Sequence, residues 1–281
     1  MQNQKAKAET FRALHNNKKM LVLPNIWDPL GAALLEKLGY PAIATASASI
    51  AYANGYNDGE HIPFNDLLFL LKKIARAVEI PVTADIESGF AATNTELQKN
   101  IELLIETGVI GINFEDSDKK NNILYPVDIQ CERIRLVRKV ATETGIPLFI
   151  NARTDVYVKG KDFPGEEEKL NETLKRGKAY IEAGADCFFP ILVTQKAAIE
   201  KLIATLNFPI NIIAFADVPD LKVLSEMGVA RVSLGPGYLK IAIRKMKEIA
   251  EKLINYEGIE EITGNEVTSD YLKALVDKRD T

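Results

Sequence analysis

The stretch Asp85-Ile86-Glu87-Ser88-Gly89 follows a short, mostly apolar run that ends at Ala84, where a strand is predicted to stop and its loop to begin. A similar pattern recurs in the next predicted repeat, as Gly111-Ile112-Asn113-Phe114-Glu115-Asp116. Neighbouring strands that both end in paired carboxylates provide the hard oxygen ligands that Mg²⁺ prefers. One acidic pair is common in loops, whereas two pairs at equivalent points of successive repeats predict a metal site.

The two acidic stretches belong to a series of eight strand-then-helix units. Alternation of this kind favours a parallel sheet with crossover helices, and eight units favour closure into a (β/α)8 TIM-type barrel. An open doubly wound sheet is the alternative, but no GxGxxG motif follows an early strand. The predicted strands cover 20–23, 41–45, 80–85, a run ending at Glu115, 148–151, 187–190, 210–213 and 231–234.

A single domain, 1–281, is predicted, with the barrel over about 20–255 and a helical extension over about 258–281. In this extension Ser269 to Lys278 is predicted to form one further helix. A helix around Glu9 to Asn16 is predicted to lie outside the barrel, so His15 is expected far from the site. Of the two histidines only His61 is expected near the rim, which argues against a histidine-centred triad.

The composition describes a globular protein with enough apolar residues for a sizeable core. Hydrophobic residues make up 47% and charged residues 26% of the chain. A net charge of −4 argues against nucleic-acid binding. The first residues are polar, without the apolar segment of a signal peptide, and no apolar run is long enough to span a membrane. Two widely spaced cysteines, Cys131 and Cys187, are expected to be free thiols, so we expect a cytoplasmic protein.

In an α/β barrel the loops that follow the strands share one rim, and the chemistry is found there. Carboxylates of this rim would bind a divalent cation, and an arginine would clamp a small oxyacid. Taken singly, each of these charged residues is also explained by a structural role, as a helix cap or as part of an ion pair at the rim. Lys119 and Lys120 are likewise explained as the solvated tip of a loop. The long polar loop 117–127 is a candidate lid. The candidate rim residues are Asn25, Trp27, Asp28, Thr45, Ser47, Asp58, Asp85, Glu87, Glu115, Asp116, Arg153 and Asp155.

These motifs, in this order, resemble the isocitrate lyase/phosphoenolpyruvate mutase superfamily over roughly residues 20–240. The matching segments are Trp27-Asp28, Thr45-Ala46-Ser47-Ala48, Asp58-Gly59, Thr83 to Gly89, Gly111 to Asp116 and Ala152 to Asp155. The resemblance implies a modified α/β barrel that uses Mg²⁺, with Mn²⁺ as a substitute, to hold the enolate of a 2-oxo acid. It also implies a homotetramer or homodimer, with the C-terminal helix exchanged between subunits.

Carried over by residue, the resemblance makes Asp85 the principal metal ligand, with Glu87, Glu115 and Asp58 holding the ion directly or through water. Ser47 and Ala48 would bind the substrate carboxylate, and Arg153 the oxyacid end. The substrate-binding set is completed by Trp27, Thr45, Asp58 and Asn113. The candidate catalytic residues are Arg153, Glu115, Lys120 and Asn122.

The loop after the fourth strand departs from the family pattern. Isocitrate and methylisocitrate lyases carry a Lys-Lys/Arg-Cys-Gly-His motif there, whereas this chain has Asp118-Lys119-Lys120-Asn121-Asn122. Lys120 and Asn122 resemble the lysine and asparagine of the mutase-type loop, without its Phe-Pro-Lys context. We therefore predict a lyase or mutase acting on a small 2-oxo acid or phosphonate, with C–C cleavage favoured. The alternatives are P–C bond chemistry and a non-catalytic barrel that binds an oxyacid.

Overall fold

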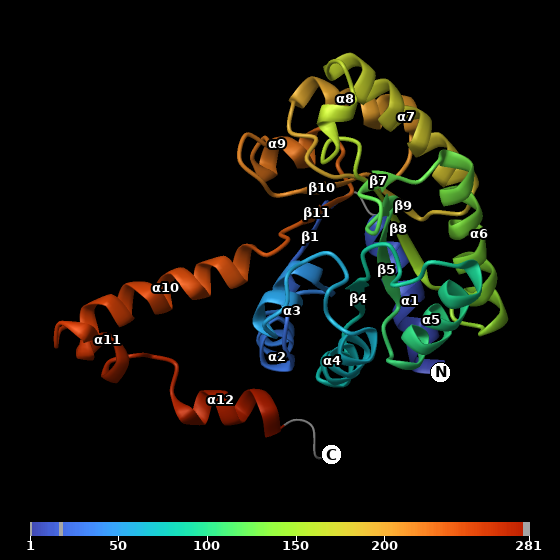
Figure 1. Ribbon diagram of the computed structural model, residues 1–281. Helices are drawn as coiled ribbons and strands as arrows, with labels where there is room; N and C mark the ends of the chain where they lie inside the picture. The colour runs from blue at the N-terminus through green and yellow to red at the C-terminus, as the bar shows by residue number, and fades with distance from the viewer. Residues whose placement is uncertain (1, 17–18, 278–281) are drawn as a thin grey trace.

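The computed structural model describes residues 2–16 and 19–277, and eight parallel staves form a closed barrel within them (Figure 1). The first stave is interrupted at Pro24 and comprises β1 and β2. Closure is completed by parallel pairing of β1 with β11 and by a bridge from Phe188 to Ile210. The predicted barrel is therefore confirmed. The strands are β1 (Leu21–Leu23), β2 (Asn25–Ile26), β3 (Ile43–Thr45), β4 (Val82–Asp85), β5 (Gly111–Glu115), β8 (Phe149–Thr154), β9 (Cys187–Pro190), β10 (Asn211–Ile213) and β11 (Arg231–Ser233).

Helices surround the barrel, and their beginnings follow local sequence signals. Asp28 caps its helix by accepting a hydrogen bond from the Gly31 amide at 2.7 Å. Thr93 and Glu96 form the predicted capping box. A short helix, α3 (Ser47–Ala53), follows β3 directly, which places its first amides at the rim. The remaining surrounding helices are α2 (Pro29–Lys37), α4 (Phe64–Arg76), α5 (Asn94–Glu106), α6 (Val127–Glu143), α7 (Glu166–Glu182), α8 (Lys196–Leu206) and α9 (Leu221–Glu226).

The loop expected as a polar lid is a small ribbon in the structure. Strands β6 (Ser117–Asp118) and β7 (Ile123–Leu124) pair in antiparallel fashion, with the lysine-rich segment as their turn. A second irregular segment, between β8 and α7, contains the 3₁₀ helix η1 (Gly160–Asp162). Both segments lie on the same side of the barrel, because Lys159 contacts Asn122.

The first helix, α1 (Gln2–His15), covers the end of the barrel opposite the rim, so it lies outside the barrel and keeps His15 away from the rim, as predicted. Phe11 is fully buried, and the ring centroids of Phe11 and Phe149 are 4.9 Å apart in an edge-on arrangement. The His15 ring lies 4.2 Å from the Phe149 ring. Arg12 contacts Asp186, which also pairs with Arg138 of α6. The helix therefore closes the bottom of the barrel.

Above this apolar base the barrel interior contains a polar layer. Arg231 is completely buried, and it donates hydrogen bonds to Ser233 at 3.1 Å and to Asn113 at 3.3 Å. Asn113 also accepts from Asn151 at 2.7 Å, and Asn211 bonds to Ser233 at 3.1 Å. Four staves, β5, β8, β10 and β11, are thus joined across the interior by side chains directly beneath the rim.

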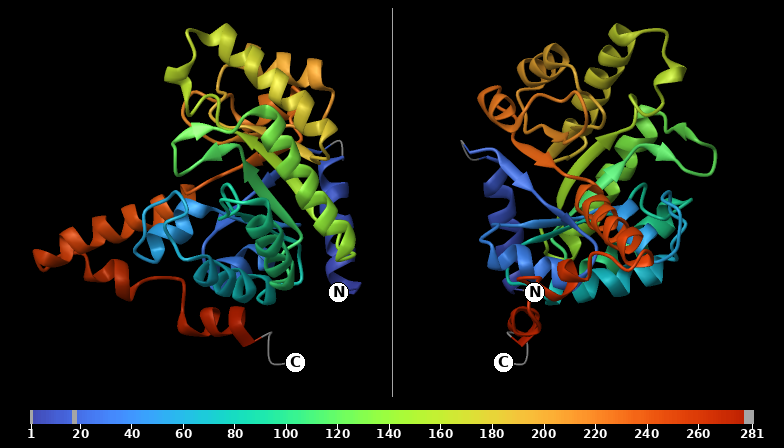
Figure 2. Two further views of the ribbon diagram at one scale, coloured as in Figure 1. Left: turned by 45° about the vertical axis from the view of Figure 1, so that its right-hand side comes forward. Right: turned by 90° about the vertical axis from the view of Figure 1, so that its left-hand side faces the viewer.

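The C-terminal segment leaves the barrel. Figures 1 and 2 show α10 (Gly237–Ile254) extending away from the strands, followed by α11 (Ile259–Thr263). The chain then returns, and α12 (Ser269–Val276) packs against α2, with Lys37 4.2 Å above the Tyr271 ring. The predicted extra helix is present, although Lys278 lies outside the described residues. No helix in the described part of the chain combines the length and apolarity needed to cross a membrane.

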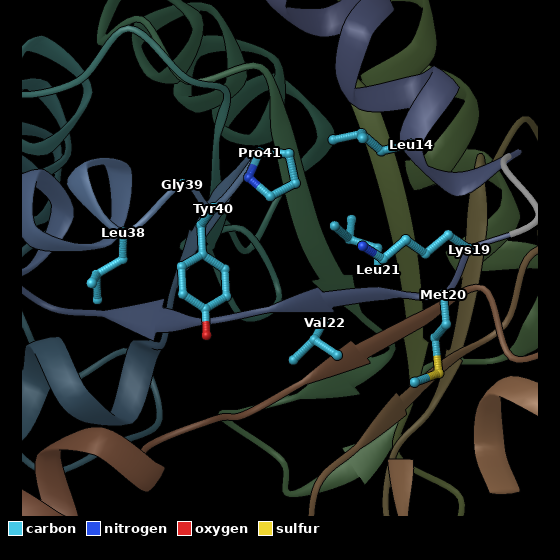
Figure 3. A pocket seen from close by; sticks show the side chains of 9 residues that line it. All are labelled: Leu14, Lys19, Met20, Leu21, Val22, Leu38, Gly39, Tyr40 and Pro41. Carbon is cyan, nitrogen blue, oxygen red and sulfur yellow. The ribbon is translucent and has the colours of Figure 1, made fainter. Parts of the chain in front are cut away.

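A hollow of about 470 Å³ lies beside β1, at the end of the barrel opposite the rim (Figure 3). Its lining comes from the start of β1 and the residues just before it, from the residues that precede β3, and from Leu14 of α1. Lys19 is the charged residue among the nine that line it, and none of the nine is a carboxylate. This hollow therefore offers no ligand set for a hard cation, and the candidate site lies elsewhere.

Candidate active site

A cavity of about 290 Å³ lies at the carboxyl ends of the strands, where the chemistry of a parallel barrel is found. Staves from around the whole barrel contribute to it, so the cavity lies on the barrel axis rather than between two outer helices. Its lining comprises Asn25, Ala46, Ser47, Ala48, Tyr52, Asp58, Asp85, Asn113, Arg153, Phe189, Ile191, Ile213, Ser233, Gly235, Pro236 and Lys240.

Asp85 ends β4 and is held by the neighbouring stave. Its Oδ2 accepts hydrogen bonds from the Ser47 amide at 3.2 Å and the Ser47 hydroxyl at 3.0 Å. Its own amide donates to the Thr45 hydroxyl at 3.0 Å. The Ser47 amide is one of the first in α3, which otherwise have no partner within their helix. Three residues predicted for the site, Thr45, Ser47 and Asp85, are therefore in direct contact.

Glu87 stands in a left-handed backbone conformation, with φ of 51°. Its Oε1 accepts a hydrogen bond from the Glu60 amide at 2.7 Å. The Glu60 carboxylate in turn accepts from the Ser88 amide and hydroxyl, at 3.0 and 2.7 Å, and from the Phe90 amide at 2.9 Å. Glu60, which the sequence analysis did not identify, thus fixes the loop that presents Glu87. An acidic residue in a glycine-containing loop carries no distinctive signal for this role.

Glu115 ends β5 and lies between two cations. Arg153, on the adjacent stave β8, approaches its Oε2 to 2.8 Å, and the Lys119 ammonium contacts its Oε1. The same ammonium lies 3.1 Å from Glu87. Arg153 also donates to Asp155 at 2.6 Å. Lys119 is therefore a site residue, and its interpretation as part of a solvated loop tip is wrong.

The protonation equilibria of this cluster reflect burial and charge. Burial raises the pKa of Glu87 to about 7, although Lys119 opposes the shift. Burial also raises the pKa of Glu115, against the opposing charge of Arg153. Partial desolvation, followed by the charge of Asp85, raises the pKa of Asp58. Burial alone would lower the pKa of Lys119, but Glu115 and Glu87 raise it, so the ammonium keeps its proton.

Comparison with known proteins is consistent with this geometry. Residues 11–254 match the phosphoenolpyruvate phosphomutase family. The chain belongs to this family. A crystal structure of a Burkholderia cenocepacia protein, provisionally named a phosphonomutase, is 38% identical with a TM-score of 0.83, covering 87% of this chain and 99% of the other. The 2-methylisocitrate lyase of Escherichia coli is 26% identical over 257 residues, 88% of this chain and 83% of the relative. A solved 2,3-dimethylmalate lyase is 25% identical with a TM-score of 0.81, covering 96% and 94%.

In this family member, several residues from the predicted set lie away from the cavity. Trp27 lines a separate apolar groove with Tyr238 and Ile241, because the chain turns outward where it leaves β2 towards α2. Lys120 and Asn122 are exposed at the turn of the ribbon, and Asn122 contacts Lys159. None of the three is in the cavity lining of this conformation. Their proposed substrate-binding and catalytic roles stay predictions.

Asp116 faces away from the cavity. It accepts hydrogen bonds from Thr154, Tyr180 and Arg176, at 2.7, 2.7 and 2.9 Å, and from the Asp155 amide at 2.9 Å. Successive residues of a strand point to opposite faces, so Glu115 and Asp116 cannot both point into the barrel. The acidic pair after β5 therefore supplies one candidate ligand and one anchor between the barrel and α7.

The donor chemistry of the cluster fits a divalent cation. Oε2 of Glu87 and both carboxylate oxygens of Glu115 are buried and form ion pairs without a hydrogen bond of regular geometry. Burial is the main cause of the raised pKa values of Glu87 and Glu115, and the charges of Lys119 and Arg153 offset it only in part. A bound divalent cation would favour the ionised carboxylates that this burial disfavours. As they stand in the described residues, no three His, Cys, Asp or Glu side chains form a ligand set. The Lys119 ammonium occupies the space between two of the candidate donors.

Proposed function

We propose that this chain is a Mg²⁺-dependent enzyme acting on a small 2-oxo acid, with C–C bond cleavage as the reaction. The observation that carries the proposal is a contact network at the strand ends of a chain from this family: Asp85 accepts from the Glu87 amide, Lys119 joins Glu87 to Glu115, and Arg153 pairs with Glu115. Similarity to 2-methylisocitrate lyase and 2,3-dimethylmalate lyase supports C–C chemistry.

Asp85, Glu87, Glu115 and Asp58 would hold the cation, directly or through water, with Mn²⁺ able to replace Mg²⁺. When bound, such an ion supplies Lewis-acid stabilisation of developing negative charge, worth several kcal/mol. The amides of Ser47 and Ala48, at the start of α3, would accept the substrate carboxylate, since a helix N-terminus favours anions. Arg153, held by Glu115 and Asp155, would orient the oxyacid end. Asn113 would contact the substrate from the bottom of the cavity.

The ribbon residues have distinct parts in this proposal. Lys119 keeps its proton at Nζ and acts as a cationic partner of the carboxylates rather than as a base. Catalytic roles for Lys120 and Asn122 would require the ribbon to close over the cavity, as lids do in many enzymes. Trp27 would bind substrate only through a change in the segment after β2.

The alternative reaction is P–C bond chemistry on phosphoenolpyruvate or phosphonopyruvate. It is favoured by the 38% identical structure, provisionally named a phosphonomutase, and by the family to which the chain belongs. A non-catalytic barrel that binds an oxyacid is the second alternative.

A screen for pyruvate release tests the proposal. The enzyme is incubated with 2-hydroxy tricarboxylates, 2-hydroxy dicarboxylates, 2-oxo acids and phosphonopyruvate, each with Mg²⁺ and with EDTA. We expect turnover of one C–C substrate that EDTA abolishes and that Asp85→Ala lowers by about a thousandfold or more, whereas Asp128→Ala, at an exposed carboxylate, leaves it unchanged. Turnover that persists in EDTA would refute the metal-dependent mechanism. Binding of Mg²⁺ and oxalate without any turnover would support the non-catalytic alternative.

We further propose a cytoplasmic homotetramer or homodimer without nucleic-acid or membrane partners. The support for association is α10, none of whose residues is buried and whose Ile241, Ile243 and Met246 are more than half exposed. Two buried free cysteines agree with a reducing compartment. Sedimentation velocity of the full chain measures the oligomeric state, and a monomer at micromolar concentration would contradict association.

A further inference from the structure

A buried arginine with only neutral partners lies beneath the candidate cavity. Arg231 begins β11 and is 0% exposed. Its side-chain hydrogen bonds go to Ser233 and Asn113, and its Nη1 has no partner among the described residues. Burial lowers the pKa of Arg231 to about 10, so the guanidinium is still charged at neutral pH. Burying a charge that gains only neutral partners costs free energy, and packing alone gives no reason for that cost.

The hydrogen bond from Arg231 decides which way the Asn113 amide points. Oδ1 of Asn113 accepts from Arg231 at 3.3 Å and from Asn151 at 2.7 Å. A guanidinium has donors only, so it can face the oxygen of an amide but not its NH2 group. Asn151 imposes no such choice, because its own amide can turn over and its Oδ1 has no partner in the described part of the chain. Arg231 therefore keeps Oδ1 of Asn113 inside the barrel and leaves Nδ2 for the cavity.

Asn113 lies level with the principal candidate metal ligand. It pairs in register with Asp85 across β4 and β5, and both residues line the cavity. Asn113 is 5% exposed, and both of its side-chain hydrogen bonds within the described residues end on Oδ1. Ser233, which accepts from Nε of Arg231, lines the same cavity. An anionic substrate in this cavity would meet the N–H donors of Asn113, whereas a reversed amide would present an oxygen that repels it.

We propose that Arg231 is a positioning residue of this site. It fixes the Asn113 amide so that Nδ2 donates a hydrogen bond to a negatively charged oxygen of the substrate. The positive charge behind Oδ1 polarises the amide and strengthens that hydrogen bond. The contact adds to those proposed for Ser47, Ala48 and Arg153 and replaces none of them. This inference rests on the proposed function, because the anion that Asn113 meets is the one held with the divalent ion.

A double-mutant cycle tests whether Arg231 acts through Asn113. Isothermal titration of the full chain in saturating Mg²⁺ gives the Kd of oxalate for the natural protein, Arg231→Met, Asn113→Ala and the double variant. We expect each single change to raise the Kd about tenfold or more, and Arg231→Met to raise it less than about threefold when residue 113 is already alanine. An equal effect of Arg231→Met in the two backgrounds would overturn the inference.

A structural arginine elsewhere in the chain provides the control. Arg138 pairs with Asp186 and donates to the carbonyls of Leu148 and Gly184, outside the cavity. Arg138→Met is expected to lower the stability in urea and to leave the Kd of oxalate unchanged. A similar rise of the Kd in this control would attribute the effect of Arg231→Met to lost stability and would count against the inference.

Two polar variants give an independent test if Arg231→Met does not fold. Lysine has donors only, as arginine has, whereas glutamine can also present an oxygen to Asn113 and allow its amide to turn. We expect Arg231→Lys to bind oxalate about tenfold more tightly than Arg231→Gln. Equal affinities would overturn the inference.

The natural protein separates this inference from the proposed function. If the natural protein does not bind oxalate in the presence of Mg²⁺, the proposed function itself is wrong. If it binds oxalate and the variants of Arg231 and Asn113 bind it equally well, only the positioning role is wrong.

Discussion

Protonation of His15 provides a quantitative test of how α1 closes the barrel. The His15 ring is buried between Phe11 and Phe149, and its Nδ1 donates to the Phe11 carbonyl at 2.9 Å. Burial, followed by the charge of Arg231, lowers its pKa from 6.5 to about 3. His15 therefore binds a proton near pH 6.5 in the unfolded chain but not in the folded chain. The free energy of unfolding consequently falls as the pH drops below 6.5.

The size of this loss follows from the two pKa values. Between pH 7 and pH 5, linkage gives a decrease of about 2 kcal/mol in the free energy of unfolding from His15 alone. The folded-state pKa is not reached in this window, so the loss is still increasing at pH 5. Other groups also titrate here, which makes a comparison between two proteins necessary.

Urea denaturation at pH 7 and pH 5 measures the effect in the natural protein and in His15→Phe. Phenylalanine keeps an aromatic ring against Phe149 and cannot be protonated, and it loses the Nδ1 hydrogen bond equally at both pH values. We expect the decrease in stability between the two pH values to be about 2 kcal/mol smaller in the variant. The same decrease in both proteins would refute the burial of a neutral His15 as the cause.

Two further predictions concern the candidate site and its support. Lys119→Met is expected to lower the Kd for Mg²⁺ about tenfold, because the ammonium that lies 3.1 Å from Glu87 no longer competes with the ion. Calorimetric titration measures the Kd. Lys120→Met, at an exposed lysine, is the control and is expected to leave the Kd unchanged. An equal or weaker Mg²⁺ affinity in Lys119→Met would contradict competition between the Lys119 ammonium and the ion. Asp116→Asn is expected to reduce the free energy of unfolding by about 3 kcal/mol, because buried Arg176 loses one carboxylate and keeps Glu172. Urea denaturation measures this loss. Asp128→Asn is the control and is expected to lose less than about 0.5 kcal/mol, and equal stability of the two variants would argue against a structural role of Asp116.

The sequence was informative where a side chain is tied to a strand end. Asp85 and Glu115 could be placed at the rim because parallel strands end on one side of a barrel, and the structure has them there. Thr45 and Ser47 followed from the same reasoning. Which member of the pair Glu115-Asp116 points inward depends on register, and the register depends on contacts with α7 that sequence spacing does not contain.

Residues outside regular strands were less predictable. Lys119 reaches Glu87 and Glu115 only because β6 and β7 form a ribbon that folds it inward, while Lys120 next to it is exposed. Glu60 acts through the left-handed backbone at Glu87, a conformation that a single sequence does not reveal. The covering role of α1 was missed because a helix on the end of a barrel has the same amphipathic pattern as one on its side.

The position of α1 also bears on how the protein is made. Arg12 and its partner Asp186 are 174 residues apart, and β1 completes the barrel only by pairing with β11. The surface on which α1 packs includes Phe149 of β8 and Cys187 of β9, so it is complete only after those staves have been synthesised. Until then the apolar face of α1 has no complete barrel end to cover it, and contacts of such long sequence separation favour slow folding.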